Sequence, residues 1–164
     1  MRNAFLSYQI FDFIAIFCPF YPTPQKIVAQ KPKTISSKEE FEVIKTHCMQ
    51  GANMLRRLEN FEDEPLLQTA YDIARWHHER WDGQGYPDGL KGNDIPISAQ
   101  IVSLADVYDA LTSERCYKKA FSHETAMRMI LNGECGAFNP LLLECLTDIQ
   151  AGLQEKSQNI TVNR

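Results

Sequence analysis

Two adjacent histidines, His77 and His78, stand directly before a run rich in Gly, Asp and Pro. A helix-forming segment carrying Asp106 and Asp109 follows that run. Imidazoles and carboxylates on packed helices, beside a rigid polar loop, are typical of a metal site. Neighbouring side chains on a helix project about 100° apart, so one small ion rarely accepts both imidazoles. Two ions that share bridging oxygen ligands would accept one imidazole each.

A structural interpretation of the histidine pair is also open. One ring would pack against Trp76 or Trp81, while the other would cap the end of a helix. Asp106 is expected on the inner face of its helix, beside Leu104 and Ala105. A carboxylate without a cation is costly to bury there. The remaining candidate, the histidine at position 123, is expected to have a structural role at the start of a helix.

The segment from Trp81 to Pro96 is dense in glycine and proline, which predicts an irregular loop. Gly83, Gly85 and Gly89 permit turns and the close approach of a ligand. The simplest interpretation is a crossover between two helices. A structureless loop of this length in a compact domain usually serves a function, however.

The elements that must position these groups are all predicted to be helices, because no alternating apolar run is typical of a strand. Apolar residues at helical spacing, together with Ser and Pro start signals, define the boundaries. Ser98 is expected to cap the helix that carries Asp106. The fold class expected is therefore all-α, with a long Gly/Pro-rich loop between two core helices. The predicted helices cover about residues 37–47, 51–58, 64–79, 98–113, 122–132 and 140–153.

Composition sets the class of protein. The 164 residues are enough for one domain with a real core, and 44% apolar and 23% charged residues are ordinary for a soluble globular protein. A net charge of −4 leaves no electrostatic footprint for DNA, RNA or an anionic membrane. Five scattered cysteines without a C-x-x-C pair favour reduced thiols in the cytoplasm over disulfides or a thiolate zinc site.

The run from residue 77 to 118 closely resembles the second half of the HD-GYP domains, a branch of the HD-type metal-dependent phosphohydrolases. Gly85, Tyr86 and Pro87 stand where that branch has the residues for which it is named. The resemblance implies an HD-domain-like helical bundle with a metal site inside it. The ligands that it implies are His47, His77, His78 and Asp106.

The resemblance also implies a ligand groove. In HD-GYP proteins the loop borders the groove for a cyclic dinucleotide, and that role carries over to Gly85, Tyr86 and Pro87. Arg115 and Lys118 match basic positions that face the phosphates of the ligand. Arg binds a phosphate through bidentate hydrogen bonds and Lys binds it as a point charge. Without the resemblance, either cation would be a typical solvated surface residue.

Further phrases extend the match over about residues 24–146. Residues 24–35 resemble the segment that follows the family's HD motif, and 138–140 resemble its Phe-Asp-Pro. Residues 41–47 resemble the phrase that delivers a histidine ligand, with Cys48 where proline is common. We therefore expect a divergent segment at 1–23, a partial HD-GYP-like domain at 24–153 and a polar tail at 154–164.

The departure from the family lies upstream. Its His-Asp pair and the following lysine should fall near Ile16, Phe17 and Phe20, and none of these binds a metal. The apolar stretch that contains them is too short for the ~20 residues of a membrane span. Three origins stay open for it: a buried amphipathic helix that ends at Pro19, a weak membrane-associating segment, or a foreign N-terminus.

The activity implied by the resemblance is metal-dependent hydrolysis of a phosphodiester in cyclic di-GMP, with iron or manganese as the cofactor. Loss of the His-Asp pair implies at most one ion, reduced occupancy and weak or absent turnover, so no residue is assigned a certain catalytic role. A homodimer or a signalling-protein partner is compatible with such a domain. The alternative is a non-catalytic nucleotide-binding or protein-interaction module derived from the same fold.

Overall fold

The computed structural model describes residues 38–58, 64–113 and 119–162, and side chains within these ranges from residue 41 to residue 152. The described part contains helices and no strand, which confirms the all-α prediction. The elements in chain order are α2 (Lys38–Arg56), α3 (Pro65–Trp76), the short 3-10 helix η2 (Gly92–Asp94), α4 (Ile97–Thr112), α5 (His123–Leu131) and α6 (Pro140–Val162).

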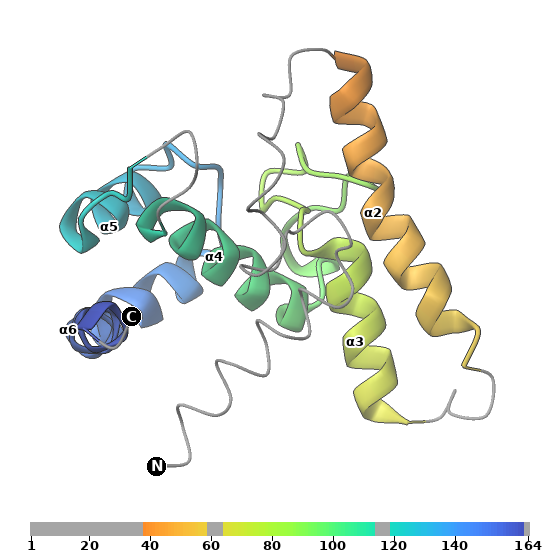
Figure 1. The fold of residues 1–164 in the computed structure, drawn as a ribbon. Helices are drawn as coiled ribbons and strands as arrows, with labels where there is room; N and C mark the ends of the chain where they lie inside the picture. Colours follow the sequence, from red (N-terminus) through yellow and green to blue (C-terminus); the bar gives the residue numbers. More distant parts are fainter. Residues whose placement is uncertain (1–37, 59–63, 114–118, 163–164) are drawn as a thin grey trace, which may run out of the picture.

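The helices pack in a series, with α2 against α3, α3 against α4, and α4 against α5 (Figure 1). Leu55 of α2 packs with Ala70 and Ala74 of α3 in one apolar cluster. A larger cluster joins α4, α5 and α6, and its centre includes the fully buried Ile130. The loop between α3 and α4 therefore lies between two packed regions, and it starts where α3 meets α2.

The predicted break between residues 47 and 51 is wrong, because α2 is continuous from Lys38 to Arg56. Glycine inside a helix costs roughly 1 kcal/mol relative to alanine, so Gly51 weakened the helical pattern. Packing overrides that cost here. Cys48 and Ala52 are completely buried, and the small side chains on this face let α2 approach α3 closely.

Three other boundaries differ from the prediction. Helix α3 ends at Trp76 rather than at residue 79, so the histidine pair lies in a turn beyond it. Helix α4 starts at Ile97 with Pro96 in the cap position, and Ser98 is not the cap. Helix α6 continues to Val162, well past the predicted end at residue 153.

The start of α5 is as predicted. The hydroxyl of Ser122 accepts a hydrogen bond from the backbone N–H of Thr125 at 3.2 Å, which satisfies one donor of the first turn. Within the described ranges, no helix has both the length and the apolar character needed to cross a membrane. The predictions for residues 1–23 lie outside the described residues.

Candidate metal centre

Four side chains converge where α2 crosses the end of α3. His47 and Cys48 come from the middle of α2, and His77 and His78 come from the turn after α3. Their potential ligand atoms all lie within 4.8 Å of one another. His47 is 3% exposed, His77 is 9% exposed and Cys48 is completely buried. The fold thus brings His47 to the pair His77 and His78, about thirty residues later in the chain. Because that pair lies in a turn and not within a helix, the 100° spacing that argued against a shared ion does not apply.

The hydrogen bonds of two rings determine which nitrogen faces the cluster. Nδ1 of His47 lies 2.6 Å from the carbonyl oxygen of Ile44, and Nδ1 of His77 lies 2.8 Å from that of Ile73. A carbonyl oxygen only accepts, so each Nδ1 carries the proton and donates it. Each Nε2 is then left with a lone pair.

Those two Nε2 atoms, of His47 and His77, face each other at 3.3 Å. Two acceptors cannot bond to each other, whereas a cation between them satisfies both lone pairs. Metal-binding histidines are commonly oriented by an Nδ1–H bond of this kind to a backbone carbonyl. The donor set therefore fits a divalent metal ion.

The environment keeps the rings in the neutral form that binds metals. Burial lowers the pKa of His77 to about 4. Desolvation lowers the pKa of His78 to about 2, and the neighbouring imidazoles add to this effect. The ring centroids of His77 and His78 are 4.1 Å apart, and those of His47 and His78 are 5.0 Å apart. A second positive ring at this distance would be strongly repelled.

The loop after α3 closes over this cluster. Tyr86 donates its backbone N–H to the carbonyl of His78 at 3.2 Å, and its ring centroid lies 4.9 Å from that of His78. Phe41 of α2 meets the same tyrosine edge-on at 6.2 Å, and Nζ of Lys45 lies 5.7 Å from its ring centroid. An aromatic wall with a nearby cation therefore borders the histidines.

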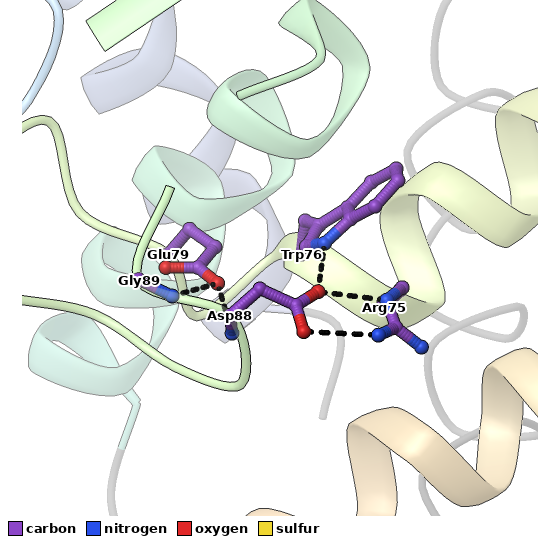
Figure 2. Close-up of polar contacts among 5 residues, drawn as sticks. All are labelled: Arg75, Trp76, Glu79, Asp88 and Gly89. Carbon is purple, nitrogen blue, oxygen red and sulfur yellow. Dashed lines mark hydrogen bonds and ion pairs between the residues drawn. The ribbon is translucent and has the colours of Figure 1, made fainter. Parts of the chain in front are cut away.

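Hydrogen bonds centred on the carboxylates of Glu79 and Asp88, named here the polar lock, hold the loop in this position (Figure 2). One carboxylate oxygen of Glu79 accepts the backbone N–H groups of Asp88 and Gly89 at 2.7 and 2.9 Å. The carboxylate of Asp88 in turn accepts both guanidinium bonds of Arg75, at 2.8 and 2.9 Å, and the indole N–H of Trp76 at 2.7 Å. The far side of the loop is thus bonded to the last turn of α3.

Glu79 is unusual because it is 3% exposed and its second oxygen, Oε2, is buried with no hydrogen-bond partner. Burial raises the pKa of this carboxyl, and the two backbone N–H bonds oppose that rise. Neither Glu79 nor Asp88 was predicted from the sequence to position the site. The signal available was weak, namely one acidic residue just before a glycine-rich run and another within it.

Replacing Asp88 with alanine should destabilise the domain by about 1–2 kcal/mol at neutral pH, since it removes three bonds at a partly exposed site. The hydrogen bonds from Arg75 hold the pKa of Asp88 below its ordinary value. The stabilisation by ionised Asp88 is therefore fully present above the pKa that Asp88 has in the unfolded chain. It is lost as the pH falls through the lower pKa that Asp88 has in the folded chain. The difference between the wild type and Asp88→Ala should shrink in acid.

Urea denaturation at several pH values measures this difference. Asp94→Ala is the matched control, because Asp94 is an exposed aspartate of the same loop. A stability difference for Asp88→Ala that persists unchanged at low pH would contradict the account.

The other predicted residues have separate positions. Asp106 is partly buried on α4 and is not a member of the four-residue cluster, so its role as a ligand stays a prediction. Asp109 accepts a hydrogen bond from the hydroxyl of Ser113 at 2.8 Å. His123 hydrogen-bonds through Nδ1 to the hydroxyl of Tyr108 at 2.8 Å, in keeping with a structural role. The predicted phosphate ligands Arg115 and Lys118 lie outside the described residues.

A family profile described as HD domain matches residues 20–137 of this chain. Curated relatives match over a similar range. A probable cyclic di-GMP phosphodiesterase of Vibrio cholerae is 44% identical over 108 residues, which cover 65% of this chain and 24% of the relative. A cyclic di-GMP phosphodiesterase of Thermotoga maritima is 41% identical over 116 residues, covering 71% of this chain and 30% of the relative.

A third relative carries a different substrate in its name. The 3'3'-cGAMP-specific phosphodiesterase 2 of Vibrio cholerae is 36% identical over 121 residues, covering 74% of this chain and 22% of the relative. The chain thus spans between about a fifth and a third of the length of these proteins. The positions of Ile16 and Phe17 precede the part matched by the family profile.

Proposed function

The chain belongs to the HD domain family, and from this premise we propose that it is a metal-binding domain of HD-GYP type that acts on a cyclic dinucleotide. Cyclic di-GMP is the proposed substrate, and hydrolysis of its phosphodiester is the proposed reaction. We further propose that turnover by this chain alone is weak. The observation that carries the proposal is the convergence of three imidazoles beside the aromatic wall of the loop.

The proposed metal ligands are His47, His77 and His78, with Asp106 as a further ligand from α4. A divalent ion held there, iron or manganese by family likeness, would supply a Lewis acid for hydrolysis. The protein's own contribution is orientation. The backbone carbonyls of Ile44 and Ile73 fix two of the rings, and the lock at Asp88 holds the loop beside them.

The proposed nucleotide site lies along the loop. The ring of Tyr86 offers a flat face on which a base can stack, and stacking of this kind contributes about 1–3 kcal/mol per base. Lys45, which forms an ion pair with Glu42 at 2.7 Å, is proposed to offer its positive charge near that ring to a phosphate. Gly85 and Pro87 flank the tyrosine and are proposed to border the same groove, and the basic residues at 115 and 118 are proposed to meet the second phosphate.

The weak turnover is proposed because, on the resemblance, the family's His-Asp pair and lysine would fall near Ile16, Phe17 and Phe20. Ile16, Phe17 and Phe20 offer neither a lone pair for a metal nor a charge for a phosphate. Dinuclear catalysis needs bridging oxygen ligands that hold two ions about 3.5–4 Å apart. A chain without the bridging carboxylate therefore retains ligand binding more readily than hydrolysis.

Calorimetric titration and chromatography of the products, with cyclic di-GMP and 3'3'-cGAMP in parallel, test this function. We expect cyclic di-GMP to bind without appreciable hydrolysis. Tyr86→Ala should weaken binding about tenfold, which corresponds to about 1.4 kcal/mol of stacking. Tyr86→Phe keeps the ring and is the matched control. Absence of binding to either nucleotide would overturn the proposal, and preferential binding of 3'3'-cGAMP would overturn the choice of substrate.

A further inference from the structure

Cys48 places a sulfur atom among the imidazoles of the metal centre. Its Sγ lies 3.4 Å from Nε2 of His47, its side chain is completely buried, and it belongs to the group whose ligand atoms lie within 4.8 Å of one another. The four ligand atoms thus lie close enough together to bind one ion.

We propose that Cys48 is a thiolate ligand, and that with His47, His77 and His78 it forms a closed four-coordinate site for one zinc-like ion. The inference rests on the proposed metal centre and changes two of its parts. Cys48 takes the place of Asp106 as the fourth ligand, and one zinc-like ion takes the place of iron or manganese. Because a thiolate is soft, such a site prefers zinc or cobalt to manganese, which favours oxygen ligands.

Two of the six separations between ligand atoms are close to the edges of a tetrahedron, and none of the six exceeds 4.8 Å. Zinc binds imidazole nitrogen at about 2.0–2.1 Å and thiolate sulfur at about 2.3 Å. A tetrahedral ion with these bonds holds two nitrogens about 3.3–3.4 Å apart, and a nitrogen and a sulfur about 3.6 Å apart. The two Nε2 atoms of His47 and His77 are 3.3 Å apart, and Sγ of Cys48 is 3.4 Å from the first of them.

The proton balance is also satisfied. In the chain without metal, the thiol of Cys48 can donate its S–H to the lone pair of His47 Nε2, since the Nδ1–H of that ring is already committed to Ile44. Binding of the ion displaces the thiol proton to solvent and leaves the sulfur as a thiolate. Nδ1 of His77 donates to the carbonyl oxygen of Ile73, so Nε2 of that ring can bind an ion through its lone pair.

A consequence for function follows from the number of ligands. Structural zinc sites are closed by four protein ligands, whereas catalytic ones keep a position open for water or substrate. A His₃Cys set closes the site between α2 and the end of α3. Low turnover then has a second cause in this chain, independent of the residues near its start, and the ion would stabilise the contact between α2 and α3.

Titration of the chain with Co²⁺ tests the proposal through its absorption spectrum. A thiolate ligand produces a sulfur-to-cobalt charge-transfer band in the near ultraviolet, and a tetrahedral site produces intense visible bands. We expect both, with an end point at one ion per chain. In Cys48→Ser the charge-transfer band should disappear, and zinc affinity should fall by at least about 100-fold, since even outer partners of a ligand contribute 10–100-fold.

Cys145→Ser is the matched control, because Cys145 is exposed on α6, and it should keep both bands. The spectrum of the wild-type chain tests the thiolate ligand without any substitution. If Cys48→Ser does not fold, Cys48→Ala replaces it in the comparison. Cobalt bound with visible bands but without a charge-transfer band would overturn the thiolate and leave the metal centre intact. A band that survives in Cys48→Ser would overturn it too. No cobalt binding at all would overturn the proposed metal centre itself.

Discussion

Replacing His77 with alanine should abolish the stabilisation of this domain by divalent metal. Nε2 of His77 lies 3.3 Å from Nε2 of His47, and the two lone pairs together form the binding position for a cation. Removing the His77 ring removes one of these two ligands. A ligand present at 100 times its dissociation constant stabilises the folded state by about 2.7 kcal/mol. For a domain of this size, that energy raises the melting temperature by roughly 5–10 °C.

Differential scanning calorimetry of each variant with and without the ion gives the rise in melting temperature on adding metal, and this rise is the quantity to compare. His77 is buried, so the alanine variant also loses stability without metal, and the difference removes that effect. His123→Ala is the control, because its ring bonds to Tyr108 and lies outside the cluster. It should keep the full shift. A shift that survives in His77→Ala would show that the metal binds elsewhere.

Replacing Gly85 with alanine should destabilise the domain by about 2–3 kcal/mol and displace the loop from the histidines. A Cβ on Gly85 would meet the backbone N of Arg80 and the Cα of Glu79, and would lie 2.6 Å from the carbonyl oxygen of His78. These are backbone atoms, so no side chain can rotate away to make room. The part of the loop that carries Tyr86 must move instead.

Gly92→Ala is the matched control within the same loop. A Cβ there meets nothing within 4 Å, although its φ of +57° costs about 1–2 kcal/mol for a residue with a side chain. Urea denaturation gives the loss of stability for each variant, and the fluorescence of the loop aromatics reports the displacement. Equal losses for the two variants would mean that the close approach at Gly85 does not hold the loop.

Much of the fold was predictable from the sequence because helix signals there are local. A helix was predicted at about residues 122–132, and α5 spans His123–Leu131, so the two boundaries agree within a residue. The end of α3 was not predictable, because it depends on bonds from a distant segment. Glu79 donates its N–H to Trp76, and Tyr86 returns to bond the carbonyl of His78. Those contacts exist only after the loop has folded back.

The candidate site also has a part that the sequence predicted and a part that it did not. The resemblance of short phrases selected His47, His77 and His78, and the structure brings these three together. The part played by Cys48 depends on how closely α2 approaches the turn after α3, and the sequence contains no signal for that distance. The scattered positions of the cysteines argued against a thiolate site, because a single sulfur among histidines has no spacing pattern to detect.

We propose that this HD domain holds one divalent ion between α2 and the turn after α3. Native mass spectrometry of the purified chain, after equilibration with zinc or manganese and removal of unbound metal, measures the number of ions directly. The account predicts one zinc ion per chain, its loss in His47→Ala, and weaker retention of manganese. Two ions per chain, or one ion that His47→Ala retains, would contradict it.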